Sequence, residues 1–200
     1  MKNKLTKTLS TLFIFIFLTS LLKATVLAEK IDSFNSDVQI NKDGTVTIEE
    51  TIKYDFESLQ RHGLVRDLNF KIKNEDGKTY ITNIAVISVT DEKGNEYNYS
   101  KSKAGSYIEL KIGDANRLVT GKKTYIIKYK VSGALRYFTD HDEFYWNLVG
   151  FDWNVPILQY SSLISLPTNL QDSELKYVCY EGPLGSTSQS CLINNVGGKI

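Results

Sequence analysis

Apolar and polar residues alternate along much of this chain, which is the pattern of β-strands with one buried and one solvated face. The clearest case surrounds an Asp-Gly turn. Val38 and Ile40 precede the turn at 41–44, and apolar residues follow it on one face: Val46, Ile48, Ile52 and Tyr54. Two alternating runs joined by Asp-Gly predict a β-hairpin.

Shorter alternating runs, separated by turn residues, continue to the end of the chain. The predicted strands are Leu68–Lys73, Tyr80–Thr90, Glu96–Ser100, Tyr107–Ile112, Lys123–Val131, Glu143–Leu148, Ile157–Leu166, Glu174–Tyr180 and Cys191–Asn194. In the seventh of these runs the residues expected to point inward are Leu158, Tyr160, Ile164 and Leu166. A helical turn is expected only within Phe56–Arg66 or Ala115–Thr120.

Many short strands with regular turns predict an all-β fold. We expect a two-sheet antiparallel β-sandwich, immunoglobulin-like in general architecture. A closed barrel is the alternative, because strand spacing alone does not separate the two folds.

The N-terminus has the three parts of a secretory signal peptide. Lysines at positions 2, 4 and 7 precede an apolar run at 12–22, and small residues end at Ala28. The run is shorter than the roughly 20 residues that a bilayer helix needs. We therefore predict a signal peptide at 1–28 and an exported domain at 29–200, with an uncleaved N-terminal anchor as the alternative.

Removal of this peptide changes the net charge. Four of the 24 Lys and Arg residues lie within 1–28, so 20 remain against 23 Asp and Glu, a balance of −3. There is no basic cluster of the kind that binds phosphates, which argues against nucleic acid as a partner. About 170 residues suit a single domain with a sizeable core.

The two cysteines, Cys179 and Cys191, enclose a Gly/Ser-rich loop. In an exported chain an even pair is expected to form a disulfide, which would contribute about 3 kcal/mol in the chain-entropy model. A catalytic cysteine is the competing interpretation, but no histidine lies nearby in sequence.

The aromatic segment 142–157 and the acidic run before it hold several candidate site residues. Asp140-His141-Asp142-Glu143, with Asp152, could supply oxygen ligands to Ca²⁺. The loop lacks the spacing of known calcium loops, however, and a solvated turn before a strand is the favoured interpretation. Asp142, Glu143 and Asp152 also allow a glycosidase-type carboxylate pair. On a strand Trp146 would point into the core, while Trp153 beside the Gly150 turn could stack on a sugar ring with Phe151 and Tyr145.

Arg61-His62-Gly63-Leu64-Val65-Arg66-Asp67 is a predicted basic loop between strands. It could bind an anion, a headgroup or a partner. In the structural alternative, Gly63 supplies a special backbone conformation and Arg66 pairs with an acid such as Asp67 or Asp142. Two histidines exclude a multi-histidine zinc site, and no metal or cofactor is expected. The candidate binding surface is Arg61, His62, Arg66, Asp142, Asp152 and Trp153.

Five segments, in order, resemble a known family: 43–50, 61–67, 112–114, 120–129, and Phe144-Tyr145-Trp146-Asn147 through Trp153-Asn154-Val155-Pro156-Ile157. They are similar to the extracytoplasmic N-terminal domain of YciQ-like predicted bacterial membrane proteins, domain of unknown function 2207. The cysteine loop at 179–186 is also similar. The resemblance implies an exported β-domain followed by transmembrane helices, and it supplies no catalytic residue.

The sequence therefore predicts a non-enzymatic binding or structural module on the extracytoplasmic face of the cell membrane. Expected partners are the membrane, through a segment beyond this sequence, and another envelope protein or cell-wall glycan. An envelope hydrolase acting on cell-wall glycan through Asp142, Glu143 or Asp152 is the alternative.

Overall fold

The computed structural model describes residues 28–73, 77–151, 153–167, 172–183, 185–196 and 199–200. The predicted signal peptide, apart from Ala28, lies outside these residues, as does Asp152. Within the described ranges, no helix has the length and apolar character needed to cross a membrane.

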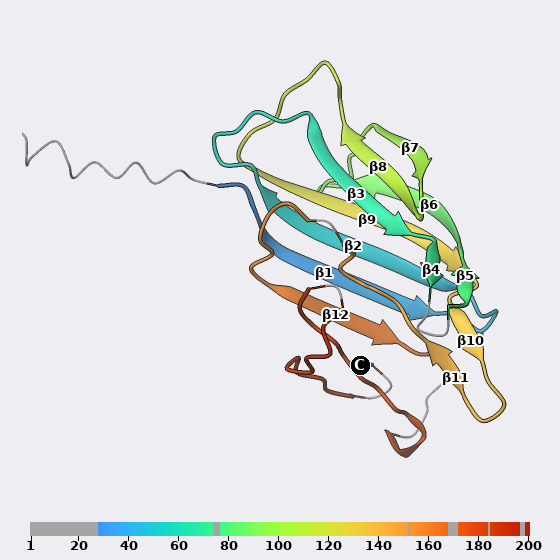
Figure 1. Cartoon of the computed structure of the whole chain (residues 1–200). Helices are drawn as coiled ribbons and strands as arrows, with labels where there is room; N and C mark the ends of the chain where they lie inside the picture. The colour runs from blue at the N-terminus through green and yellow to red at the C-terminus, as the bar shows by residue number, and fades with distance from the viewer. Residues whose placement is uncertain (1–27, 74–76, 152, 168–171, 184, 197–198) are drawn as a thin grey trace, which may run out of the picture.

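The described residues form β-strands and one short 3-10 helix, η2 (Figure 1). Their bounds are β1 (Lys30–Ile40), β2 (Val46–Asp55), β3 (Gly63–Asn69), β4 (Lys71–Lys73), β5 (Thr79–Ile81), β6 (Asn83–Thr90), β7 (Tyr99–Ala104), β8 (Tyr107–Gly113), β9 (Lys122–Ser132), β10 (Leu135–Tyr137), β11 (Asp142–Phe144), β12 (Tyr160–Ser165) and η2 (Asp172–Glu174). The predicted all-β fold is confirmed.

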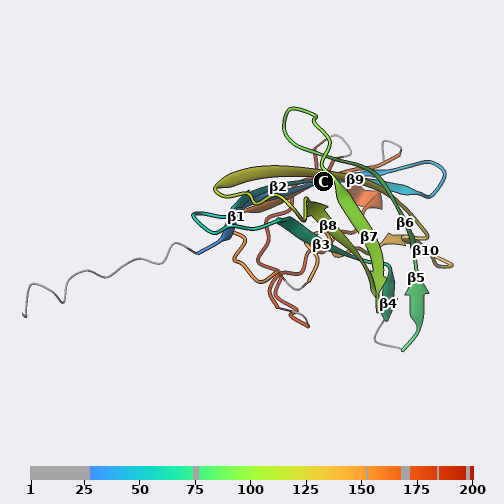
Figure 2. The ribbon, with the colours of Figure 1, turned by 90° about the horizontal axis from the view of Figure 1, so that it is seen from above.

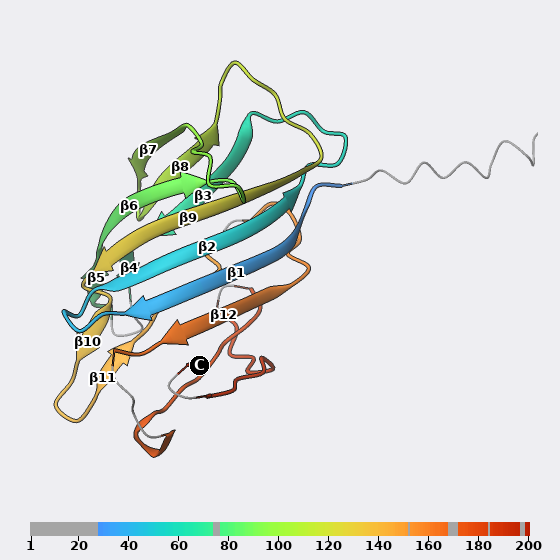
Figure 3. The ribbon, with the colours of Figure 1, turned by 180° about the vertical axis from the view of Figure 1, so that it is seen from behind.

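The strands form two main layers. A five-stranded sheet has the order β12-β1-β2-β9-β6 and a three-stranded sheet the order β3-β8-β7. Seen from above, the smaller sheet lies under one face of the larger one (Figure 2). Two ribbons, β4–β5 and β10–β11, lie at one end (Figure 1). This arrangement is the predicted sandwich, with one pair departing from the antiparallel rule, since β12 runs parallel to β1 (Figure 3).

The predicted hairpin is β1–β2, with Ile40 opposite Val46. Its turn is made by local polar groups, because the Asp43 carboxylate accepts from the Thr45 backbone N–H at 3.0 Å. Gly44 has a φ of +76°, which favours glycine. The turn chemistry thus sets the register that buries one face of both strands.

Alternate residues of both layers fill the core. The fully or nearly buried apolar side chains include Ile31, Phe34 and Val38 of β1, Val46, Ile48 and Ile52 of β2, Leu64 and Leu68 of β3, Ile108, Leu110 and Ile112 of β8, and Tyr125, Ile127, Tyr129 and Val131 of β9. Between them lie two charged side chains, Glu50 and Arg66.

Several predicted elements are corrected. No helical turn forms in Phe56–Arg66, whose second half instead begins β3, and Glu174–Tyr180 is irregular apart from the end of η2. The predicted strand Tyr80–Thr90 is divided into β5 and β6 at Thr82, which donates its N–H to the Phe70 carbonyl at 2.8 Å. Leu158, expected to be buried, is 57% exposed because β12 begins only at Tyr160.

Candidate functional site

A buried ion pair joins the two layers of the sandwich. Glu50 comes from the inward-facing row of β2 and Arg66 from that of β3. The Arg66 Nε donates to Glu50 Oε2 at 2.7 Å, and Nη2 donates to Oε1 at 2.6 Å. Arg66 is 2% exposed and Glu50 is fully buried. Such a two-pronged contact offsets much of the cost of burying both charges.

Two aromatic side chains extend the pair into a network. Tyr129 of β9 donates its hydroxyl to Glu50 Oε1 at 2.7 Å, and the Trp146 side chain interacts with the same hydroxyl. Burial, reinforced by the negative charge of Glu50, raises the pKa of Tyr129 well above its ordinary value. Burial tends to lower the pKa of Arg66, but the charge and hydrogen bonds of Glu50 outweigh it and the pKa is raised. Both groups therefore keep their protons, and Arg66 keeps its charge.

The remaining sides of the Arg66 guanidinium are also covered. Its Nη1 donates to the Asp67 carbonyl at 2.9 Å, and its carbon lies 5.4 Å and 5.5 Å from the ring centres of Phe34 and Trp153. A Cβ added at Gly150 would lie 2.1 Å from Arg66 Nη1, so any other residue there would have to displace the guanidinium. The turn at Gly150 thus closes directly over a buried cation.

The segments that carry the family resemblance converge on this network. The segment 43–50 supplies Glu50, 61–67 supplies Arg66, 120–129 supplies Tyr129, and the aromatic segment supplies Trp146 and Trp153. The third segment, 112–114, pairs with the second, 61–67, in the β3–β8 ladder. The segments that carry the family resemblance therefore build the interior of the domain.

The pairing of Gly63 with Gly113 explains the glycine in the Arg61–Asp67 segment. The two residues lie opposite each other with φ values of +134° and +136°. A Cβ on Gly63 would lie 1.9 Å from the Ile112 carbonyl oxygen, and one on Gly113 2.0 Å from that of His62. The predicted special backbone conformation of Gly63 is confirmed.

Of the five described residues of the predicted binding surface, Arg66 and Trp153 are in contact with each other, while Arg61, His62 and Asp142 lie on other parts of the surface. Arg61 is exposed near the start of β1, where its Nε donates to Glu29 at 3.0 Å. The exposed His62 has its Nδ1 3.1 Å from the Asp114 carbonyl oxygen. Asp142 is exposed at the start of β11. Asp152 lies outside the described residues.

The prediction that Arg66 lies on the surface is wrong, because its side chain is buried. Its expected pairing with an acid is confirmed, but the acid is Glu50 and not the suggested Asp67 or Asp142. Trp153 is partly exposed as predicted, yet its indole N–H donates to the Val149 carbonyl at 2.9 Å and its ring meets Phe34 edge-on. Trp146 packs against the core as predicted, although from an irregular segment, because β11 ends at Phe144.

A different group of side chains gathers at the β10–β11 hairpin, which extends beyond the end of the large sheet (Figures 1 and 3). Arg136 of β10 lies between two rings, 4.3 Å from the centre of Tyr80 and 5.0 Å from that of Tyr145. Its Nη1 also donates to Glu143 Oε2 of β11 at 3.2 Å. On this face of the hairpin, two tyrosine rings and one carboxylate hold the guanidinium of Arg136.

The opposite face and the tip of the hairpin carry more exposed rings. Tyr137, opposite Asp142, is 69% exposed and Phe138 is 48% exposed. Phe138 stacks on His141 with ring centres 4.7 Å apart. The His141 Nδ1 lies 2.9 Å from Asp140 Oδ1. A hydrogen bond from His141, with a smaller effect of Lys176, lowers the pKa of Asp140. We use the name aromatic hairpin for Leu135–Phe144 with Tyr145.

The acidic run does not form a metal centre within the described ranges, where no three His, Cys, Asp or Glu side chains form a group able to hold an ion. Glu143 is turned to Arg136, and Asp140 to His141. An open hollow of about 690 Å³, lined by Lys71, Thr79 and Ser106 among others, lies elsewhere. Its lining residues are lysine, glycine, threonine and serine, without the hydrophobic and aromatic side chains usual in small-molecule sites.

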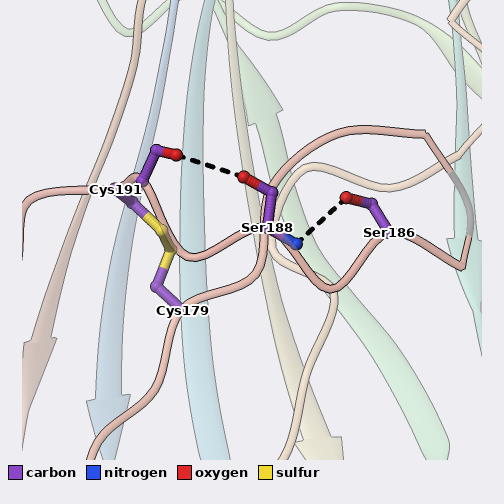
Figure 4. Close-up of a disulfide and its surroundings, with 5 residues drawn as sticks. Cys179, Ser186, Ser188 and Cys191 are labelled. Atoms are coloured by element: carbon purple, nitrogen blue, oxygen red, sulfur yellow. Dashed lines mark hydrogen bonds between the residues drawn. A yellow bond between two sulfur atoms is a disulfide. The ribbon is translucent and has the colours of Figure 1, made fainter.

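The predicted disulfide is confirmed. Cys179 and Cys191 are bonded with Cα atoms 6.2 Å apart (Figure 4). Inside the loop, the Glu181 N–H donates to the Ser188 carbonyl at 3.0 Å. The Ser188 N–H donates to the Ser186 hydroxyl at 3.2 Å (Figure 4). The bridge and these bonds order a segment that has few regular backbone contacts.

Comparison with protein families assigns almost the whole described chain to one family. Residues 30–195 match the model of the predicted membrane protein (DUF2207) N-terminal domain. The chain belongs to this family. The DUF2207 domain has no established function, and a search of curated proteins found no match.

The DUF2207 domain is also similar to parts of several solved peptidase structures. Native yeast LTA4 hydrolase matches with a TM-score of 0.43 and 10% identity over 72% of this chain and 24% of the hydrolase. A two-domain M1 zinc metallopeptidase matches with a TM-score of 0.37 and 8% identity over 56% and 22% of the two chains. A putative protease from Parabacteroides distasonis matches with a TM-score of 0.31 and 10% identity over 68% and 27%. The chain thus spans about a quarter of each, and scores this low carry no functional argument.

Proposed function

We propose that this domain is a non-enzymatic binding module of the cell envelope, and that the aromatic hairpin is the surface it presents to another envelope protein. The observation that carries the proposal is the exposure of Tyr137, Phe138 and Tyr145, at 69%, 48% and 50%, on one projecting hairpin. Aromatic and arginine side chains are enriched at the centres of protein interfaces.

The hairpin is rigidly supported, which favours recognition. Leu135 and Phe144 pack against the core at its base, and Arg136 is fixed between two rings and Glu143. After the hairpin, the chain is held by Trp146 on Tyr129 and by Gly150 over Arg66. A surface already ordered before binding loses less entropy when a partner docks.

Two observations support an extracytoplasmic, membrane-associated setting. The family consists of predicted membrane proteins. The Cys179–Cys191 disulfide fits an oxidising compartment, because disulfides are rare in the cytosol. The predicted signal peptide is consistent with export, and cell-surface biotinylation of the intact protein tests it.

Site-specific photo-crosslinking in producing cells tests the binding role. A crosslinking residue in place of Phe138 is compared with one in place of Ile87, which is 56% exposed on β6 in the main sheet. We expect a discrete crosslinked band from position 138 and none from position 87. Equal crosslinking at both positions, or none at position 138, would contradict the proposal.

The alternative function, an envelope hydrolase, is tested by incubating the purified chain with cell-wall glycan. Release of soluble fragments that is lost in Glu143→Gln would favour the hydrolase. Retention of intact glycan favours the binding module. The pairing of Glu143 with Arg136 at 3.2 Å supports a structural use of this carboxylate.

A further inference from the structure

We propose that the face of the aromatic hairpin formed by Tyr137 and Asp142 binds a cationic side chain, arginine or lysine, from a partner polypeptide. This proposal rests on the binding role given above and adds the chemistry of the partner. Its basis is a comparison between the two faces of the hairpin.

One face already holds a cation of the protein itself. Arg136 lies between Tyr80 and Tyr145 and pairs with Glu143, which stands opposite it in the β10–β11 ladder. Ring faces attract cations through their quadrupole, and a carboxylate adds direct charge attraction. The hairpin therefore contains a working example of a tyrosine-carboxylate set around a guanidinium.

The next pair along the ladder repeats this composition on the other face. Tyr137 stands opposite Asp142, and side chains directly opposite in a strand pair lie close enough to contact one ligand group. Both are exposed. Within the described ranges, no Lys or Arg is found within salt-bridge distance of Asp142. Tyr137 and Asp142 thus provide the aromatic ring and the carboxylate of the first set, without a cation of the described chain between them.

The surrounding charge favours a basic partner over an acidic one. Asp140, Asp142 and Glu143 lie within one short hairpin, and Arg136 and Glu143 neutralise each other. Asp140 is engaged by His141. Among these three carboxylates, Asp142 therefore offers an incoming cation the strongest electrostatic attraction. A neutral glycan would use the rings but would leave this charge without a partner.

The Tyr137 ring is also held in place. A Cβ on Gly44 would lie 2.7 Å from the Tyr137 hydroxyl oxygen, so the end of this side chain rests against the β1–β2 turn while most of the residue stays open. A ring positioned before binding presents its free face at little entropic cost.

Nuclear magnetic resonance titration of the nitrogen-15-labelled chain tests the proposal. The added molecules are a blocked tetra-arginine peptide, a blocked tetra-aspartate peptide and a chitin tetrasaccharide. We expect only tetra-arginine to shift the amides, with the shifts centred on Tyr137 and Asp142. Asp142→Asn and Tyr137→Ala should each raise Kd by about fivefold, as for loss of one exposed cation contact.

Two matched variants control for charge and for the hydroxyl. Glu92→Gln removes one exposed carboxylate from the turn after β6 and should leave Kd unchanged. Tyr137→Phe keeps the ring and should also preserve binding. An equal effect of Glu92→Gln and Asp142→Asn, or shifts with the tetrasaccharide alone, would overturn the cation proposal. Crosslinking that persists at position 138 in that case would leave the binding role standing.

Discussion

Glu50 and Arg66 lie on facing sheets and meet in the middle of the sandwich, with two hydrogen bonds of 2.7 Å and 2.6 Å between them. Tyr129 and Trp146 complete the polar chain, and the Gly150 turn covers it. This network fixes the segment that follows the aromatic hairpin. Arg66, expected at the surface from the sequence, is therefore part of the buried network that holds this segment.

Removal of the buried carboxylate should strongly destabilise the domain. Glu50→Gln leaves the Arg66 charge buried without a counter-charge, and loss of one member of such a pair costs about 3–5 kcal/mol. Urea unfolding measures the change. The neighbouring Glu49→Gln is the control, because Glu49 forms a half-exposed pair with Lys128 on the outer face and such pairs contribute about 0–1 kcal/mol. Equal losses from the two variants would argue against the network.

Gly150→Ala should cost more than an ordinary glycine substitution. The residue has a φ of +87°, and its Cβ would collide with Arg66 Nη1. Gly94 has a φ of +81° with no atom within 4 Å of its ideal Cβ, so Gly94→Ala measures backbone strain alone, about 1–2 kcal/mol. The difference in unfolding free energy between the variants isolates the contact with Arg66. Matching values would show that the guanidinium moves away freely.

Stability should fall as pH rises above about 10, the pKa of an exposed tyrosine. Burial raises the pKa of Tyr54, Tyr125 and Tyr129 in the folded protein, so these hydroxyls keep protons that the unfolded chain releases. The stabilising effect is complete below the unfolded pKa and is lost as pH rises through the folded values. Each tyrosine contributes a slope of up to about 1.4 kcal/mol per pH unit. Urea unfolding between about pH 9 and 11 measures this slope, and tyrosinate absorbance counts the protons released. Full ionisation of all 12 tyrosines near pH 10 in a folded chain would contradict the expectation.

Reduction of the disulfide should loosen the C-terminal loop and leave the sandwich folded. The bridge closes a loop that is not part of the β2–β9 ladder, and its loss costs about 3 kcal/mol at most in the chain-entropy model. Hydrogen exchange after reduction should show faster exchange at the Glu181 amide, which bonds within the loop, and unchanged exchange at Ile48. Cys179→Ser with Cys191→Ser should behave in the same way. Loss of protection at Ile48 would show instead that the bridge supports the whole domain.

The sequence was most informative where structure depends on neighbours in the chain. The Asp-Gly turn and the alternation around it predicted the β1–β2 hairpin with its buried face, because turn and strands are contiguous. The disulfide followed from export and an even cysteine count. The aromatic segment was predicted as a longer strand than it is, since after Phe144 the side chains of Asn147 and Trp153 bond to nearby backbone groups in place of a ladder.

The partner of Arg66 was not predicted from the sequence, because the two residues meet only when strands separated in sequence pack together. A signal was nevertheless present. Glu50 occupies an inward position between Ile48 and Ile52, and Arg66 lies between Leu64 and Leu68 in the same alternation. Opposite charges at two buried positions indicate a buried pair.

The aromatic hairpin had a weaker signal in the sequence. Tyr80 and Arg136 meet only because β4–β5 and β10–β11 lie at the same end of the sandwich, which no local pattern encodes. Adjacent Tyr137 and Phe138 in a three-residue strand and its turn were the visible hint.

The parallel pairing of β1 with β12 determines how the domain responds to mechanical force. The two strands run side by side from Phe34 opposite Tyr160 to Gln39 opposite Ser165. A pull on the start of β1 against the end of β12 therefore loads the hydrogen bonds of this ladder together, in shear, rather than opening them one at a time. A domain carried between a membrane and an external partner would transmit tension along this pair of strands in shear.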